Sequence, residues 1–485
     1  MATMSLPGRP DLDQLRRQAK ELRNAARAGD ARALVRLRAY QPTGAPLTLA
    51  AAQLVVAREH GCASWPQLKA TVEERRMSRD QKLRAFVLAS IQGHADRAVR
   101  LLREDPDLAG ADIWTAAVLG EAARVREMLA RDPALAARPD PESGWTPLLV
   151  VCNSRWHQFE PSRGPGLCEV AEVLLDSGAD PDTAVGQVPR PGHCSALYAA
   201  AGLANHPALA ELLLKRGADP DTPAALYHTA FHRDHVCLRL LLEHGAQTEG
   251  GDALAAAISV NDIDAVRLLL DAGIDPARPL PPQALGESYA PEPLVGAVHA
   301  AVELQCDLEL IGLLLERGGD AGAVGQDGFS AYRLAIRHGR TDVAELLRSH
   351  GAGDDAAAVD RFLGACVRAD RAEAQRRAAR RPGLVDALAL GDLRAICHAA
   401  EHGNVAAVQL MVDLGFPIDA NVGDDGATPL HAAAYSGAAD VVGLLTDRGA
   451  DIEAHDTTWE ATPLCWATVG SGFGTRHNPS PDWVA

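Results

Sequence analysis

Aromatic side chains are scarce in this sequence: Phe, Trp and Tyr make up 4% of its 485 residues. A large globular enzyme usually fills its core with more aromatic and β-branched residues, whereas stacked thin helices pack with alanine and leucine. Long apolar runs are missing too, since none approaches the roughly 18 residues of a membrane-spanning helix. The first residues, MATMSLPGRPDLDQ, lack the apolar core of a signal peptide. We therefore expect a cytoplasmic protein that does not enter a membrane.

The nine cysteines form no pattern that indicates a disulfide framework or a structural zinc site. Their number is odd, they are widely spaced and no CxxC pair occurs, whereas such sites need paired cysteines at regular spacing. We expect most of them to be small buried apolar residues in a reducing compartment.

Charge is unevenly distributed along the chain. The net charge is -17, yet residues 1–80 contain 14 Lys and Arg against 8 Asp and Glu. The remainder is strongly acidic and is a poor electrostatic match for a phosphate backbone. Its charge suits a protein partner with a basic surface, or it simply keeps an alanine-rich chain soluble.

Residues 426–453, GATPLHAAAYSGAADVVGLLTDRGADIE, read as one complete structural unit. Thr428 is expected to cap a short helix, with Pro429 in its first turn, and Gly437 to end it. A second helix follows with an apolar face of valine and leucine, and Gly449 stops it. A helix pair this short cannot bury its own apolar face, so it needs copies on both sides.

This unit resembles the ankyrin repeat. The resemblance is carried by Thr428-Pro429-Leu430-His431, Ala433-Ala434, Gly437, Leu444-Leu445 and Gly449-Ala450-Asp451. It implies an all-α solenoid of stacked helix–turn–helix repeats with short β-turn fingers, and a protein that binds other macromolecules.

A turn glycine after each second helix marks the phase of the repeats. Consecutive marks lie 28 to 45 residues apart, around the ankyrin period of about 33; they are Gly178, Gly217, Gly245, Gly273, Gly318, Gly351, Gly383, Gly415 and Gly449. Three units, ending in LLREDPDL, MLARDPAL and RAARRPGL, have proline in place of the Gly-Ala-Asp signal. In total we expect about eleven full repeats and an incomplete one.

Residues 1–79 differ from the repeats and are predicted to form a basic helical capping module of four helices. The string AREHGCASWPQLK resembles a small helical module at the N-terminus of many bacterial proteins, and the composition also looks bacterial. Covering the first repeat is the simplest role, because the ends of a solenoid need a polar cap. A separate binding role is the alternative.

Two arrays are predicted, one of about eight repeats at 80–356 and a second of about three at 357–485. The stretch 352–356 between them is the best candidate hinge, although a continuous solenoid is the simpler reading. At the C-terminus, residues 460–469 read as a first helix, and 482–485 as the opening of a second. We expect either a truncated chain or a partner that completes this repeat.

Insertions near 153–166, 187–194 and 278–293 are the best leads to a binding site. Exposed aromatic and arginine side chains on loops are typical of interaction hot spots. The candidate partner-binding residues are Trp156, His157, Phe159, Arg163 and Tyr289. The alternative is that Trp156 and Phe159 fold back and fill a gap between adjacent helix pairs.

No catalytic, cofactor-binding or metal-binding set is predicted. His228, His232 and His235 have a spacing that a metal site uses, but His228 occupies the repeat's TPLH position, as His431 does. Histidines there are expected to bond backbone at turns. The glycine cluster at 470–474 neither follows a strand nor opens a helix, so it is read as a loop. GHCSA at 192–196 likewise lacks the setting of a nucleophile elbow.

The favoured function is therefore a non-catalytic scaffold that binds a protein partner. One alternative is an enzyme or regulator whose activity lies in residues 1–79 or in a missing C-terminal part. Another is a nucleic-acid-associated regulator that uses the arginine-rich N-terminus, which has no interleaved aromatics to support it.

Overall fold

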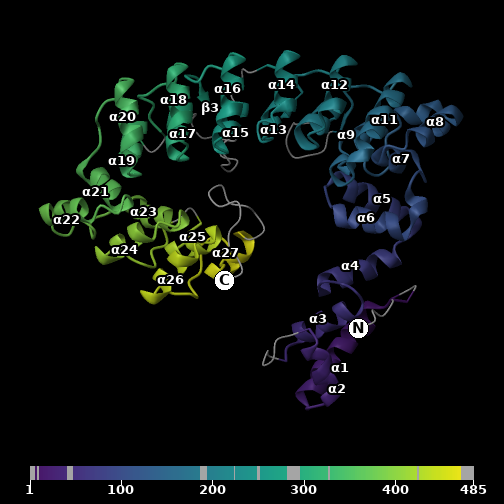
Figure 1. Ribbon diagram of the computed structural model, residues 1–485, viewed down its shortest axis with the longest axis horizontal. Helices are drawn as coiled ribbons and strands as arrows, with labels where there is room; N and C mark the ends of the chain where they lie inside the picture. Colours follow the sequence, from purple (N-terminus) through teal and green to yellow (C-terminus); the bar gives the residue numbers. More distant parts are fainter. Residues whose placement is uncertain are drawn as a thin grey trace. The chain divides into compact units, whose positions relative to one another are not determined.

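The computed structural model describes residues 6–7, 10–40, 47–185, 194–222, 224–247, 252–280, 295–325, 328–422 and 425–470. The chain divides into two compact units, one made of residues 1–200 and 208–218 and the other of residues 201–207 and 219–485. Most described residues are helical (Figure 1). Among them, no helix has the length and apolar character needed to cross a membrane.

The first unit begins with four helices that precede the repeats. They are α1 (Leu12–Arg27), α2 (Ala31–Arg38), α3 (Leu49–Glu59) and α4 (Trp65–Arg76). Leu15, Leu22, Val55 and Leu68 are buried in their shared core. Ser64 caps α4, because its hydroxyl accepts a hydrogen bond from the Gln67 amide at 3.3 Å. The prediction of additional N-terminal helices is confirmed.

Helix pairs occupy the rest of the first unit. Its remaining helices are α5 (Arg79–Ile91), α6 (Ala95–Glu104), η1 (Pro106–Leu108), α7 (Ile113–Leu119), α8 (Ala122–Arg131), η2 (Pro133–Ala136), α9 (Pro147–Cys152), α10 (Trp156–Phe159), η3 (Pro161–Arg163) and α11 (Gly164–Asp176). Two further helices, η4 (Tyr198–Leu203) and α12 (Pro207–Lys215), cross the division between the units. The first two proline-type endings form the short turns η1 and η2.

The second unit continues the pairs. Its helices are α13 (Ala225–Thr229), α14 (Val236–Glu243), α15 (Asp252–Ser259), α16 (Ile263–Asp271), α17 (Ala297–Glu303), α18 (Leu308–Glu316), α19 (Ala331–Arg337), α20 (Thr341–Ser349), α21 (Ala358–Val367), α22 (Arg371–Arg380), α23 (Leu390–Glu401), α24 (Val405–Asp413), α25 (Pro429–Ser436), α26 (Ala439–Asp447) and α27 (Pro463–Gly470). First helices pack on first helices, as α15 on α17 and α17 on α19, and each pair stands beside the next (Figure 1). Each pair thus buries its apolar face against its neighbours.

The unit at 426–453 has the predicted local structure. The Thr428 hydroxyl accepts a hydrogen bond from the His431 amide at 3.4 Å, and Pro429 takes the first helical position of α25. Gly437 and Gly449 end the two helices with φ of 71° and 87°, a conformation that favours glycine. His431 reaches the following finger, where its Nε2 lies 3.0 Å from the Ala461 carbonyl oxygen.

Two insertions are anchored by short antiparallel strand pairs. Strand β1 (Ala184–Val185) pairs with β2 (Cys194–Ser195), and β3 (Pro279–Leu280) pairs with β4 (Val295–Gly296). The pairs close the ends of the segments predicted as insertions near 187–194 and 278–293. Residues 186–193 and 281–294, and with them Tyr289, lie outside the described residues.

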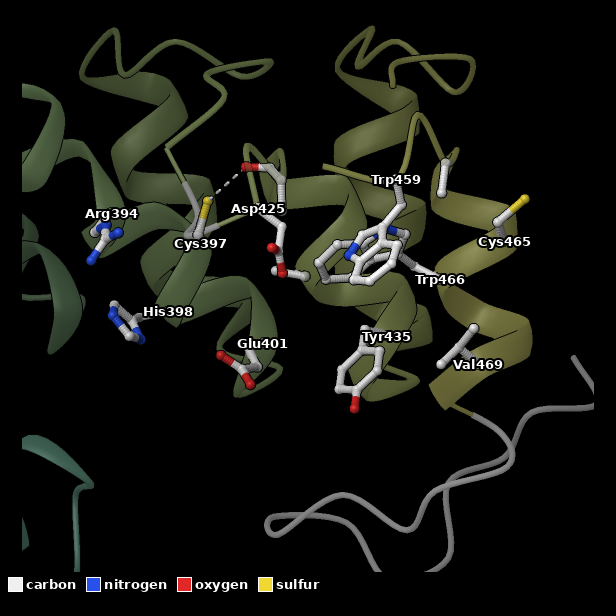
Figure 2. A pocket seen from close by; sticks show the side chains of 13 residues that line it. Arg394, Cys397, His398, Glu401, Asp425, Tyr435, Trp459, Cys465, Trp466 and Val469 are labelled. Carbon is white, nitrogen blue, oxygen red and sulfur yellow. Dashed lines mark hydrogen bonds between the residues drawn. The ribbon is translucent and has the colours of Figure 1, made fainter. Parts of the chain in front are cut away.

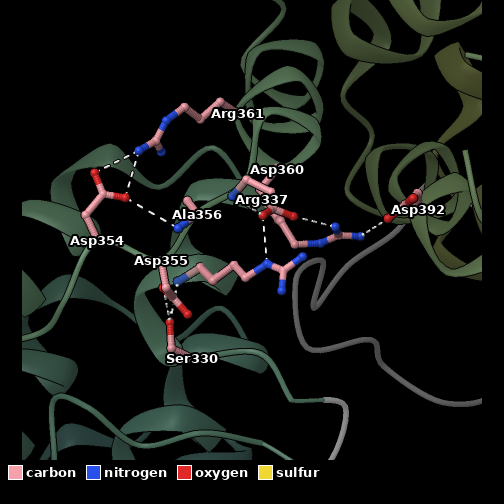
Figure 3. A network of polar contacts seen from close by, with 10 residues as sticks. Ser330, Arg337, Asp354, Asp355, Ala356, Asp360, Arg361 and Asp392 are labelled. Carbon is pink, nitrogen blue, oxygen red and sulfur yellow. Dashed lines mark hydrogen bonds and ion pairs between the residues drawn. The ribbon is translucent and has the colours of Figure 1, made fainter. Parts of the chain in front are cut away.

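Packing is continuous across the predicted hinge at 352–356, which falls inside the second unit. Helix α21 follows this stretch and packs on α19 so closely that a Cβ at Gly364 would meet the Ile336 carbonyl oxygen at 2.0 Å. The buried Asp360 of α21 binds Arg333 and Arg337 of α19, and Arg361 binds Asp354 (Figure 3). The division of the repeats into two arrays at residue 356 stays a prediction.

Candidate functional site

A groove lies on the last described repeats of the second unit, over the helices α23, α25 and α27 (Figure 2). We call it the C-terminal groove; it has a volume of about 640 Å³. Two loops that lead into α25 and α27 complete it. Its lining residues are Arg394, Cys397, His398, Glu401, Asp425, Ala427, Ala432, Tyr435, Trp459, Ala461, Cys465, Trp466 and Val469.

Aromatic side chains dominate one end of the C-terminal groove. Tyr435 and Trp466 meet nearly edge to face, with ring centroids 5.7 Å apart and an interplanar angle of 74°. Trp459 lines the same end and is 71% exposed. Val469 of α27 also lines the groove and is 52% exposed. Such a cluster of exposed apolar surface is uncommon without a binding role.

A buried carboxylate, Asp456, holds this end in place. It accepts hydrogen bonds from the Thr458 amide at 3.0 Å, the Ala461 amide at 3.2 Å and the Trp466 indole at 2.8 Å. Burial alone would raise the pKa of Asp456, but hydrogen bonds, led by that of the Trp459 amide, outweigh it and lower the pKa. The ionised Asp456 carboxylate therefore holds Trp459 through its backbone amide in the loop and Trp466 through its indole.

Charged groups of both signs line the other end. Arg394 and His398 come from α23, together with Glu401, and Asp425 comes from the loop before α25 (Figure 2). Arg394 is fixed by a 2.9 Å hydrogen bond from its Nε to the Val422 carbonyl. The groove thus combines an aromatic end with an end of mixed charge, which is the composition of a protein-binding surface.

The two thiols of the C-terminal groove differ in exposure. Burial raises the pKa of Cys397 to about 12, so this thiol stays protonated at neutral pH. Cys465 is exposed, and the hydrogen bond from the Thr462 side chain lowers the pKa of its thiol. A protonated thiol is a weak nucleophile, so Cys397 is suited to packing.

The predicted candidates at 153–166 lie in the first unit and form no part of this groove. Trp156 is 2% exposed, and its indole donates a 2.9 Å hydrogen bond to the Ser90 hydroxyl of α5. Its ring meets Phe86 and Phe159 at centroid distances of 6.1 and 5.6 Å. Trp156 is therefore not an exposed side chain. It folds back and fills a gap between helix pairs, which is the alternative that the sequence analysis gave.

The other candidates in this segment surround Trp156. The Arg163 guanidinium lies 5.2 Å from the Trp156 ring centroid and forms ion pairs with Glu160 and Glu121. His157 and Phe159 are half-buried. Their role in binding a partner stays a prediction, as does that of Tyr289.

Two of the histidines at 228–235 contact neighbouring helix pairs; His232 contacts backbone, as expected, whereas His235 contacts a carboxylate. His232 Nε2 lies 2.8 Å from the Gly202 carbonyl oxygen, and His235 Nε2 lies 3.0 Å from the Asp262 carboxylate. Within the described part of the chain, no group of three or more His, Cys, Asp and Glu residues is placed to hold a metal ion.

Sequence reasoning passed over Tyr435, Trp459 and Trp466. Tyr435 lies in a regular repeat, and the two tryptophans lie in the finger and first helix of the incomplete last repeat, whereas the predicted binding residues lie in the insertions. A usable signal was present: the stretch from Asp456 to Pro463 has the same spacing of Asp before Thr-Pro as 140–147. Of the seven tryptophans, Trp459 lies in this stretch and Trp466 three residues after it.

Comparison with known proteins identifies the repeats. A family model described as "Ankyrin repeats (3 copies)" matches residues 196–279 and 376–456. Serine/threonine-protein kinase 12 of Arabidopsis thaliana is 41% identical over 70 residues, which are 14% of this chain and 15% of that protein. The human ASB11 ankyrin repeat domain, known from a crystal structure, aligns with 45% of this chain and 91% of its own at 19% identity and a TM-score of 0.34.

The chain is an ankyrin repeat domain-containing protein with additional N-terminal helices. The second matched segment includes α23, α25 and the loop before α25, which supply eight of the thirteen residues that line the C-terminal groove. Ankyrin repeats typically bind proteins.

Proposed function

We propose that this protein is a non-catalytic interaction scaffold that binds a protein partner through the C-terminal groove. The observation that carries the proposal is the exposure of Trp459 beside Tyr435 and Trp466, on a loop that Asp456 holds rigid. Tryptophan and tyrosine are the side chains most enriched at binding hot spots. A rigid loop also loses little conformational entropy on binding.

The side chains of the C-terminal groove suit a protein ligand. A standard interface buries about 800 Å² on each partner, so a partner would cover the groove and neighbouring first helices. The aromatic end supplies apolar contact, while Arg394, Glu401 and Asp425 supply polar contacts at the margin.

The test is a crosslinking pull-down from native lysate, treated with nuclease, that compares the full-length protein with two variants. Trp459→Ala removes the exposed indole, and Ile452→Ala removes a 58% exposed apolar side chain outside the groove. We expect one protein to be captured by the wild type and by Ile452→Ala and to be lost with Trp459→Ala.

Capture that is equally strong with all three proteins would contradict a role for the C-terminal groove. Recovery of nucleic acid alone before nuclease treatment would favour the alternative of a nucleic-acid-associated regulator.

A further inference from the structure

A second groove lies in the first unit, between α5, α7 and the finger that leads into α9. We call it the N-terminal groove; it has a volume of about 530 Å³, within the range of ligand-binding clefts. Its lining residues are Asp80, Leu83, Arg84, Ala85, Val87, Leu88, Ile91, Asp112, Trp114, Asp140, Glu142, Ser143, Trp145 and Val150.

Helix α5 is apolar on two faces. Phe86 and Ala89 are fully buried in the core of the first repeats. Leu83 and Val87 are partly buried against this core and also line the N-terminal groove, while Leu88 lines the groove and is 45% exposed. A helix that needs only one buried face usually carries polar residues on the other. The second apolar face therefore suits a partner, because covering it removes apolar surface from water.

Two tryptophans complete the apolar floor. The Trp114 indole donates a 2.9 Å hydrogen bond to the Trp145 carbonyl, so its polar atom is satisfied within the protein. Trp114 and Trp145 are both half-buried. Each can offer its ring to a ligand, and indole rings attract cations as well as apolar groups.

Carboxylates outnumber cations around this floor. Asp80, Asp112, Asp140 and Glu142 line the groove, and Arg84 is the one cation among the described lining residues. Arg84 already forms an ion pair with Glu142. Burial alone would raise the pKa of Asp140, but hydrogen bonds from the Ser143 amide and hydroxyl and the Glu142 amide outweigh it and lower the pKa. The groove therefore keeps its excess of negative charge at neutral pH.

We propose that the N-terminal groove is a second binding site, which accepts a basic amphipathic segment of a partner protein. The apolar side chains of that segment lie on Leu83, Leu88 and Trp114, and its Lys or Arg side chains lie beside Asp80 and Asp140. Charge complementarity selects this occupant, because an acidic segment would place like charges together. Helices that dock in grooves use this combination of apolar anchors and flanking charges.

This site differs from the C-terminal groove in the charge that it selects. The C-terminal groove has the Arg394 guanidinium and the His398 imidazole beside the carboxylates of Glu401 and Asp425, so its charge is closer to balance. The N-terminal groove has four carboxylates against one guanidinium. The two sites therefore favour different partners, and the second proposal does not depend on the first.

The probe is a pair of synthetic peptides with the same helical spacing of leucines, one filled with lysine and the other with glutamate. Isothermal titration calorimetry measures their binding to the full-length protein. We expect the lysine peptide to bind at least about tenfold more tightly than the glutamate peptide at low salt. This preference should shrink between about 0.1 M and about 0.5 M salt, since added ions screen exposed charges.

Two pairs of variants locate the binding. Leu88→Ser is matched by Val99→Ser on α6, because these residues are 45% and 44% exposed and only Leu88 lines the groove. Asp80→Lys is matched by Asp96→Lys, since both carboxylates lie in the first turn of their helices. We expect Leu88→Ser and Asp80→Lys each to weaken binding of the lysine peptide by about fivefold or more. Both controls should stay within about twofold.

Several results would overturn the proposal. Equal binding of the two peptides would remove the charge preference, and no binding of either would remove the site. Equal losses in a groove variant and its control would place the peptide elsewhere. Self-association that Leu88→Ser abolishes, without peptide binding by the wild type, would identify a second copy of this chain as the occupant instead.

Discussion

Asp360 shows how a single residue can join two repeats. Its side chain has no exposed surface, yet it carries a carboxylate that two guanidinium groups bind. Arg333 Nε donates to one oxygen at 2.7 Å, and Arg337 Nη1 donates to the other at 2.7 Å. The Ala357 amide also donates at 2.7 Å, so the carboxylate caps the start of α21 as well.

We predict that Asp360→Ala lowers the local free energy of unfolding by about 3 kcal/mol, because the half-buried Arg333 loses this carboxylate and the buried Arg337 keeps only its ion pair with Asp392. Hydrogen–deuterium exchange of the α19 and α21 amides measures the change. The control is Asp354→Ala, which removes the exposed partner of Arg361 in the same network and should change exchange little. Similar exchange in the two variants would contradict a structural role for the buried pair.

Residue-scale features were predictable where they are local in sequence. Thr428, His431 and Gly449 cap helices through contacts within a few residues, and their positions in the repeat indicate those roles. The ion pair of Arg333 with Asp360 spans 27 residues, and Trp466 reaches Asp456 from the next helix. Nothing in the repeat pattern marks the pair of Arg333 and Asp360, because it depends on how neighbouring repeats stack, and the spacing of Asp456 before Thr-Pro does not indicate which side chain the carboxylate holds.

The short helix α10 shows what an inserted element does in this fold. It follows α9 directly, and the Ser154 hydroxyl ties its start to the Val118 carbonyl at 2.6 Å. Trp156 then fills space against Phe86 of α5. Helix α10 thus connects helices from three helix pairs. It stabilises the first unit mainly through the one buried indole of Trp156.

We predict that Trp156→Ala destabilises the first unit by about 3–5 kcal/mol, the usual cost of deleting a buried tryptophan side chain. Thermal unfolding followed by circular dichroism should show a clear drop in Tm. Trp459→Ala is the matched control, since the same change at a 71% exposed position should cost no more than about 0.5 kcal/mol. If both variants melt like the wild type, the inserted segment is free for recognition, as its sequence first suggests.

The positions of the helices were largely predictable from the sequence, whereas the elements that form the C-terminal groove were not. Glycine and proline punctuation indicated the helix pairs, and Thr-Pro marked the start of α9, α25 and α27. The insertion at 153–166 was predicted to bind a partner because it contains aromatic residues. Composition alone, however, cannot distinguish an exposed ring from one that packs inward. Trp459 lies in a finger of ordinary length, so no departure from the repeat pointed to it.

At the scale of the whole molecule, stability in stacked repeats is a sum of contacts between neighbours. The N-terminal helices take part through Glu74 of α4, which is 2% exposed. Its carboxylate binds Arg97 at 2.8 Å and Arg100 at 2.9 Å, and both arginines belong to α6. These contacts tie the N-terminal helices to the first repeat, and the capping role of residues 1–79 stays a prediction. A separate binding role for these helices stays open.

We predict that Glu74→Ala loosens α4 and α6 by about 3 kcal/mol, since two arginines lose the carboxylate that they share in a buried position. Glu73→Ala is the matched control, because Glu73 is 55% exposed at the side chain and pairs only loosely with Lys69 at 3.7 Å; it should cost no more than about 0.5 kcal/mol. Hydrogen–deuterium exchange resolves the effect along the chain. Faster exchange should be confined to the first unit, while α23 to α26 keep their protection, because each repeat contacts only its neighbours. Equal loss of protection in α23 to α26 would show instead that the array unfolds as one cooperative body.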